Sequence, residues 1–175
     1  CVGLPIVSCI AYLTLFTPNI RDLITGTDSN ALTSGGFGPN QVSTMLGLGM
    51  FIFVSRLMLL SNTKYLFIVN LFITLVITYR GFITFSRGGM ITGFMMIFVL
   101  IFVSYFFISR VKKMRMIMMI VFVMLAFSAA WSYSIEQTNG MLEKRYSNQD
   151  AAGRVKEDQL SGRTELATDE VETFL

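Results

Sequence analysis

The sequence predicts an all-α protein, a polytopic bundle of about five transmembrane helices that leads into the start of a large extracytoplasmic helical loop. Of its 175 residues, 53% are hydrophobic and only 14% are charged. The apolar residues stand in runs of about twenty, the length that crosses the hydrocarbon core of a bilayer. We therefore expect residues 1–134 to form the transmembrane region and residues 135–175 to begin the loop.

The first apolar segment, residues 1–16, would reach only about 24 Å as a helix, which is short for a span. A polar, turn-rich loop follows, and Asn40, directly after Gly38-Pro39, is the expected N-cap of the next helix. Because the chain starts without Met and stops inside an amphipathic pattern, we expect it to be part of a longer protein. The other expected spans are residues 42–60, 65–85, 90–109 and 116–134.

The basic residues predict the orientation. Residues 1–134 carry nine Lys or Arg against two Asp, whereas residues 135–175 hold nine acidic against five basic residues. The positive-inside rule places the basic turn Arg110–Arg115 in the cytoplasm, and the turn at Lys64 agrees. The loop 17–41, the break at 86–89 and the tail after residue 134 then lie on the outer face. Topology explains these bases, so we expect no nucleic acid partner.

The break Ser86-Arg87-Gly88-Gly89 separates two long apolar runs. An arginine at full membrane depth costs roughly 2.5 to 3.5 kcal/mol, so Arg87 should lie at the interface or meet an anion. Two glycines allow a ligand close to the backbone, and a following helix would direct its free N–H groups to the same place. The combination suits a phosphate group. The alternative is an arginine that extends to the interface from a helix end.

Two other segments are candidates for the same outer pocket. Arg80 precedes Arg87 by two helical turns, so both would share a face and form an anion clamp if the helix persisted. Gly38 and Asn40 belong to a glycine-rich segment that would supply a second lining at a helix start. The alternatives are an arginine at a helix end for Arg80 and ordinary turn residues for the segment.

The tail contains Arg163 in Ser161-Gly162-Arg163, followed by an amphipathic pattern for which Thr164 is the expected N-cap. Arg163 would then stand just ahead of a helix on the outer face, and the alternative is an ordinary solvated arginine. With two cysteines and no histidine in the chain, we expect neither a metal site nor a cofactor.

Three motifs in order carry a resemblance to a known family: Gly36-Phe37-Gly38-Pro39-Asn40, Phe85-Ser86-Arg87-Gly88-Gly89 and Ser161-Gly162-Arg163. From residue 35 to the end, the chain resembles the bacterial O-antigen ligase and O-antigen polymerase-like glycosyltransferases. The resemblance implies a multi-pass protein of the bacterial inner membrane that acts in lipopolysaccharide or other polysaccharide biosynthesis.

The resemblance also implies the partners and the site. The donor would be an undecaprenyl-diphosphate-linked glycan, and the acceptor a glycan, the lipid A core or a protein, with membrane lipids around the bundle. Arg87 and Arg163 would be the catalytic arginines. The donor would be bound by Arg80, Ser86, Gly88, Gly89, Gly38 and Asn40.

The chain departs from the family in three ways. Family members often have Asn-Pro-Asn at the first motif and an arginine shortly before it, and this chain has neither; it also has no histidine. Because a histidine activates the acceptor in that family, we expect the catalytic base beyond Leu175 and an inactive protein without it. A transporter or flippase for an anionic lipid-linked substrate is the alternative, although such sites tend to lie near the membrane midplane. The other alternative is a non-catalytic assembly subunit.

Overall fold

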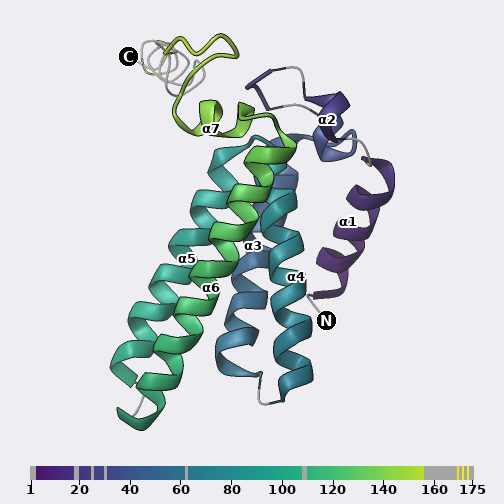
Figure 1. Ribbon diagram of the computed structural model, residues 1–175. Coiled ribbons are helices and arrows are strands. Elements are labelled where there is room, and N and C mark those ends of the chain that lie inside the picture. The colour runs from purple at the N-terminus through teal and green to yellow at the C-terminus, as the bar shows by residue number, and fades with distance from the viewer. Residues whose placement is uncertain are drawn as a thin grey trace.

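The computed structural model describes residues 3–17, 20–24, 26–29, 31–61, 63–107 and 110–155, together with residues 169, 171 and 173. All regular secondary structure in these ranges is helical, which confirms the predicted all-α class (Figure 1). The elements are α1 (Gly3–Phe16), α2 (Ile20–Leu23), the 3-10 helix η1 (Leu32–Ser34), α3 (Pro39–Leu59), α4 (Lys64–Ile83), α5 (Arg87–Phe107), α6 (Arg110–Gln137) and α7 (Met141–Tyr146).

Four of the described helices, α3 to α6, are long and apolar enough to cross a membrane, and α1 is a shorter apolar helix of 14 residues. The chain is therefore a polytopic membrane protein. Its four full-length helices and one short helix correspond to the about five spans expected from the sequence.

Two local predictions at helix ends are wrong. The N-cap of α3 is Gly38, with extended backbone, and not Asn40. Pro39 takes the first helical position, where its missing N–H costs nothing. The Arg110–Arg115 segment is not a turn but the first turns of α6, because arginine, lysine and methionine are all good helix formers.

The break between α4 and α5 is also displaced from its expected place. Helix α4 ends at Ile83, and α5 already begins at Arg87 rather than at Met90. The irregular residues are therefore Thr84 to Ser86. Arg87, Gly88 and Gly89 form the first turn of α5, whose N–H groups have no partner within the helix.

Helix α3 is the centre of the bundle and packs through glycines on two sides. On one side α5 lies against it so closely that a methyl group on Gly47 would overlap the carbonyl of Gly89. On another side a methyl group on Gly49 would come within 2.7 Å of the Ile6 side chain of α1. Small residues of this kind let helix backbones approach in a membrane, where packing drives association.

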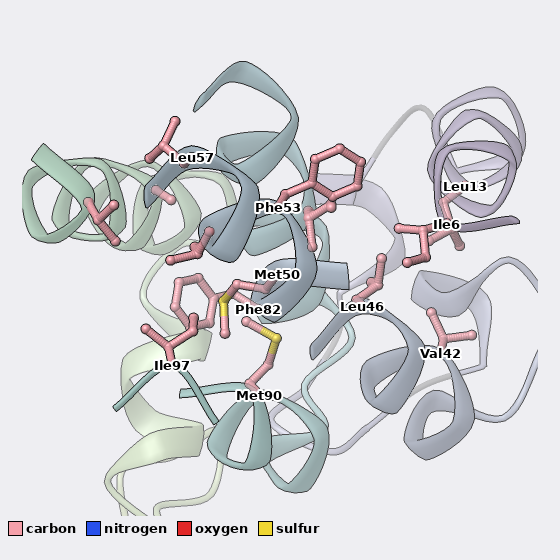
Figure 2. Close-up of a cluster of buried hydrophobic side chains, with 14 of the residues drawn as sticks. Ile6, Leu13, Val42, Leu46, Met50, Phe53, Leu57, Phe82, Met90 and Ile97 are labelled. Carbon is pink, nitrogen blue, oxygen red and sulfur yellow. The ribbon is translucent and has the colours of Figure 1, made fainter. Parts of the chain in front are cut away.

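The core fills the space around α3. Figure 2 shows Met50 of α3 and Phe82 of α4 in the middle of the cluster with Met90 of α5, while Ile6 and Leu13 approach from α1. All five side chains are at most 4% exposed. The helix ends that carry the polar motifs are thus fixed by apolar packing directly beneath them.

Candidate functional site

The polar motifs gather at one end of the bundle. Figure 1 shows α2, the link between α4 and α5, and α7 at the same end, while the turn between α3 and α4 lies at the opposite end. The start of α6, with its basic residues, also lies away from α7. This is the one-sided arrangement expected from the sequence. Which side of the membrane this end faces remains a prediction.

The link between α4 and α5 is a tight, buried turn. Thr84 donates a 2.7 Å hydrogen bond to the carbonyl of Gly81 and accepts one from the Ser86 N–H at 3.3 Å. Phe85 has a φ of 55°, a left-handed conformation that bulky residues rarely adopt. Such a residue costs about 1 to 3 kcal/mol and persists only where its surroundings hold it. Here the Phe85 side chain is only 1% exposed.

The start of α3 holds this link in place. The Ser86 hydroxyl donates a 2.8 Å hydrogen bond to the side-chain oxygen of Asn40. The Ser43 hydroxyl donates a 2.9 Å bond to the carbonyl of Ser86. The prediction that the break lies beside the Gly35–Asn40 segment is confirmed. Ser86 and Asn40 use these polar groups on each other, and their contact with a ligand stays a prediction.

The two glycines of the break have different surroundings. Gly89 is buried, and a methyl group there would overlap the backbone of Ser43 on α3. Gly88 is exposed, and a methyl group there would meet nothing within 4 Å. Gly89 therefore serves helix packing, and Gly88 is the position at which another molecule can approach the backbone. Gly38 is exposed at the N-cap of α3.

Arg80 does not share a helical face with Arg87, so the predicted paired clamp is wrong in its geometry. The helix ends at Ile83, and the chain turns before Arg87. The Arg80 side chain is only 7% exposed, and its Nη1 donates to Thr17 at the end of α1, with 2.9 Å to Oγ1 and 3.4 Å to the carbonyl. Arg80 therefore ties α1 to α4.

A different arginine lies against the link that precedes Arg87, and sequence reasoning missed it. Arg145 of α7 donates a 3.1 Å hydrogen bond from Nε to the carbonyl of Phe85, one residue from Ser86. Its Nη1 lies 3.5 Å from Oδ1 of Asp28 in the 26–29 segment. The Arg145 side chain is 12% exposed, whereas that of Asp28 is 81% exposed. An ion pair with so exposed a carboxylate contributes little.

Arg145 lies near the start of α5, because it bonds the carbonyl of Phe85, two residues before Arg87. Burial lowers the pKa of Arg145, and the positive charge of Arg87 lowers it further, while Asp28 and Tyr146 act in the opposite direction. Burial also raises the pKa of Tyr146 to about 12, although both arginines favour its ionised form. The two positive charges repel each other, and a bound anion would relieve the repulsion.

Helix α7 exists because the chain reverses after α6. Asn139 and Gly140 both have left-handed backbone, with φ of 49° and 77°. The fully buried Leu142 then anchors the short helix, and its N–H donates to Thr138 at 3.3 Å. The Asn-Gly pair followed by Met141-Leu142 is a turn signal before an apolar pair. That signal could have located α7 and, with it, Arg145.

Arg163 and the expected Thr164 N-cap lie outside the described residues. In the part of the chain that the structure describes, no three His, Cys, Asp or Glu side chains come together to hold a metal ion. What this end of the bundle offers is cationic and hydrogen-bonding: Arg87, Arg145, Tyr146 and the open backbone at Gly88.

Comparisons with known proteins add no relative. No family model matches the chain, and no curated protein or solved structure is significantly similar to it. The function must therefore follow from the chemistry of the residues.

Proposed function

We propose that the protein is a glycosyltransferase of the O-antigen ligase or polymerase type in a bacterial inner membrane. Its donor would be an undecaprenyl-diphosphate-linked glycan, and Arg87 would bind the diphosphate. The observation that supports this most strongly is that Arg145 bonds the carbonyl of Phe85, two residues before Arg87, at the end of the apolar bundle. A lipid-linked diphosphate carries its charge at the membrane surface, directly above its apolar chain, and the arginines stand at the corresponding place above the apolar helices.

The reaction needs the positive charge. Transfer breaks the bond between the anomeric carbon of the glycan and the bridging oxygen of the diphosphate. A new bond forms from that carbon to a hydroxyl oxygen of the acceptor, and the proton of that hydroxyl passes to a general base. The electron pair of the broken bond stays on the departing diphosphate, where negative charge grows. Guanidinium groups bind phosphate through two parallel hydrogen bonds, and fixed in place they stabilise this charge in the transition state.

Arg145 extends the site beyond the residues expected from the sequence. Its Nε is occupied by the Phe85 carbonyl, which fixes the guanidinium plane. Its Nη1 lies 3.5 Å from Oδ1 of the exposed Asp28, and a phosphate with higher charge would compete with that carboxylate. Because the chain has no histidine, we assign donor binding, and not activation of the acceptor, to these residues.

The test is transfer of an undecaprenyl-diphosphate-linked glycan by the full-length protein, in membranes with matched protein levels. We expect Arg87→Ala to abolish transfer or reduce it severely, and Arg87→Lys to recover only part, since lysine keeps the charge but loses the paired hydrogen bonds. Arg145→Ala should also reduce transfer. Arg56→Ala, which alters an exposed arginine near the other end of α3, is the matched control. Transfer by Arg87→Ala at the control level would refute the proposal.

A further inference from the structure

Tyr146, the last residue of α7, directly follows Arg145 and packs between aromatic rings of two other helices. Its ring packs edge-on against Trp131 of α6, with 5.0 Å between centroids, and against Phe82 of α4 at 6.1 Å. Phe82 and Trp131 also contact each other at 5.1 Å. Two aromatic rings from two other helices thus fix the direction of the phenol.

The hydroxyl of Tyr146 is buried, and among the described residues it has no hydrogen-bond partner. Proteins rarely leave a buried hydroxyl unpaired, because the group loses its bonds to water on folding. An aromatic packing role alone would be served better by phenylalanine. With its pKa raised to about 12 by burial, the phenol keeps its proton at neutral pH and can act as a donor.

We propose that the Tyr146 hydroxyl is a third ligand of the anionic group bound by Arg87 and Arg145, donating a hydrogen bond to a diphosphate oxygen. The inference rests on the proposed function and deepens it, since it adds a neutral donor of fixed direction to two cations. Neighbouring residues position all three groups: the Phe85 carbonyl bonds Arg145, the aromatic rings hold Tyr146, and Arg87 begins α5 directly after the link. A neutral donor adds direction to binding, whereas the cations add charge.

The chain contains its own reporter for the test. Trp131 is its single tryptophan and touches Tyr146, so its fluorescence should respond when a ligand binds there. The 175-residue chain in detergent micelles would be titrated with farnesyl diphosphate, farnesyl monophosphate and inorganic diphosphate. The variants are Tyr146→Phe, Arg87→Ala and, as the matched control, Tyr133→Phe, which changes an exposed tyrosine of α6. Thermal unfolding without ligand is recorded for each protein.

We expect farnesyl diphosphate to bind the wild type, and Tyr146→Phe to weaken binding by about 10- to 100-fold, as for loss of a hydrogen bond to a charged group. The same variant should unfold at the same or a higher temperature, because it removes a buried unpaired hydroxyl. Equal binding by inorganic diphosphate would identify a free phosphate ligand, with the same expectation for Tyr146→Phe.

The two proposals fail in different ways. If Tyr146→Phe binds as tightly as Tyr133→Phe while Arg87→Ala does not bind, Tyr146 is no ligand and the proposed function stands. If the wild type binds none of the probes, or Arg87→Ala binds them normally, the proposed function fails and the inference about Tyr146 fails with it.

Discussion

The hydroxyl of Ser86 donates a 2.8 Å hydrogen bond to the side-chain oxygen of Asn40, across 46 positions of sequence. This bond joins the start of α3, where the glycine-rich segment ends, to the break before α5. It forms where α3 and α5 are already in contact through glycines. Two motifs that look like separate turns in the sequence are therefore one structural unit beneath Arg87.

Removing this hydrogen bond should lower the free energy of unfolding of the protein. We expect Ser86→Ala and Asn40→Ala each to destabilise the protein, with a coupling energy of about 0.5 to 1.5 kcal/mol in the double variant, the usual net value of one hydrogen bond. Equilibrium unfolding in mixed detergent micelles measures it. Strictly additive effects would show that the two side chains do not support each other.

The adjacent glycines of the break offer a matched pair of substitutions. Gly89→Ala should destabilise the protein by at least about 1 to 3 kcal/mol, because its methyl group would push α5 away from Ser43 on α3. Gly88→Ala should leave stability equal or raise it by up to about 1 kcal/mol, since alanine favours a helix and the space is open. If a ligand approaches the backbone at Gly88, the Gly88→Ala variant should lose transfer activity without losing stability. Thermal unfolding and transfer are measured on the same preparations, and similar unfolding temperatures for both variants would contradict the packing.

Arg80 should behave as a structural residue and not as a ligand. We expect Arg80→Ala to lower the free energy of unfolding by about 1.5 to 3 kcal/mol, the range for hydrogen bonds that involve a charged group, because it removes the link to Thr17. Binding of farnesyl diphosphate per folded molecule should stay unchanged, in contrast to Arg87→Ala. An Arg80→Ala variant with wild-type stability that no longer binds farnesyl diphosphate would show that Arg80 is a ligand.

The raised pKa of Tyr146 predicts how stability depends on alkaline pH. Burial favours the neutral phenol in the folded protein. The contribution of this preference to the free energy of unfolding is fully present below pH 10, the ordinary pKa of tyrosine. It is lost as the pH rises towards about 12, since the unfolded chain then binds fewer protons than the folded one. Tyr146→Phe should therefore gain stability relative to the wild type between these values. Thermal unfolding at several pH values tests this, with Tyr133→Phe as the control, and a constant difference across the range would contradict it.

The orientation in the membrane can be tested by cysteine labelling. With the native cysteines replaced by serine, Asp150→Cys should react with an impermeant maleimide added to intact cells, and Lys112→Cys should react only after permeabilisation. The basic residues at the start of α6 are the reason, under the positive-inside rule. Labelling of position 112 but not of 150 from outside would invert the topology.

The spans could be predicted because the apolar runs are long and few charges interrupt them. The ends of the helices were harder to predict, because they depend on contacts between segments that are distant in the sequence. Arg87 follows a link whose shape is fixed by Asn40 and Ser43, so its place in the first turn of α5 does not follow from its local sequence. Proline prefers the first helical position, so Pro39 makes Gly38, and not Asn40, the N-cap of α3.

The site was predicted only in part, for a similar reason. Spacing in a continuous helix predicted that Arg80 would pair with Arg87, but the intervening turn directs Arg80 to Thr17 instead. The actual neighbour, Arg145, comes from a helix of six residues, too short to show helical periodicity. The Asn139-Gly140 turn and the buried Leu142 could have marked this helix. The contact of Arg145 with the Phe85 carbonyl joins residues 60 positions apart, and no local pattern predicts it.

The order in which the later helices pack on α3 affects how the chain folds during its synthesis. Helix α5 packs on α3 and α6 packs on α4, so neither of the later helices rests mainly on the one before it. During synthesis, the glycine surface of α3 around Gly47 must face lipid or the insertion machinery until Gly89 arrives 42 positions later. A chain whose synthesis stops after α4 would thus be a helical hairpin whose glycine surface on α3 has lost its partner helix α5.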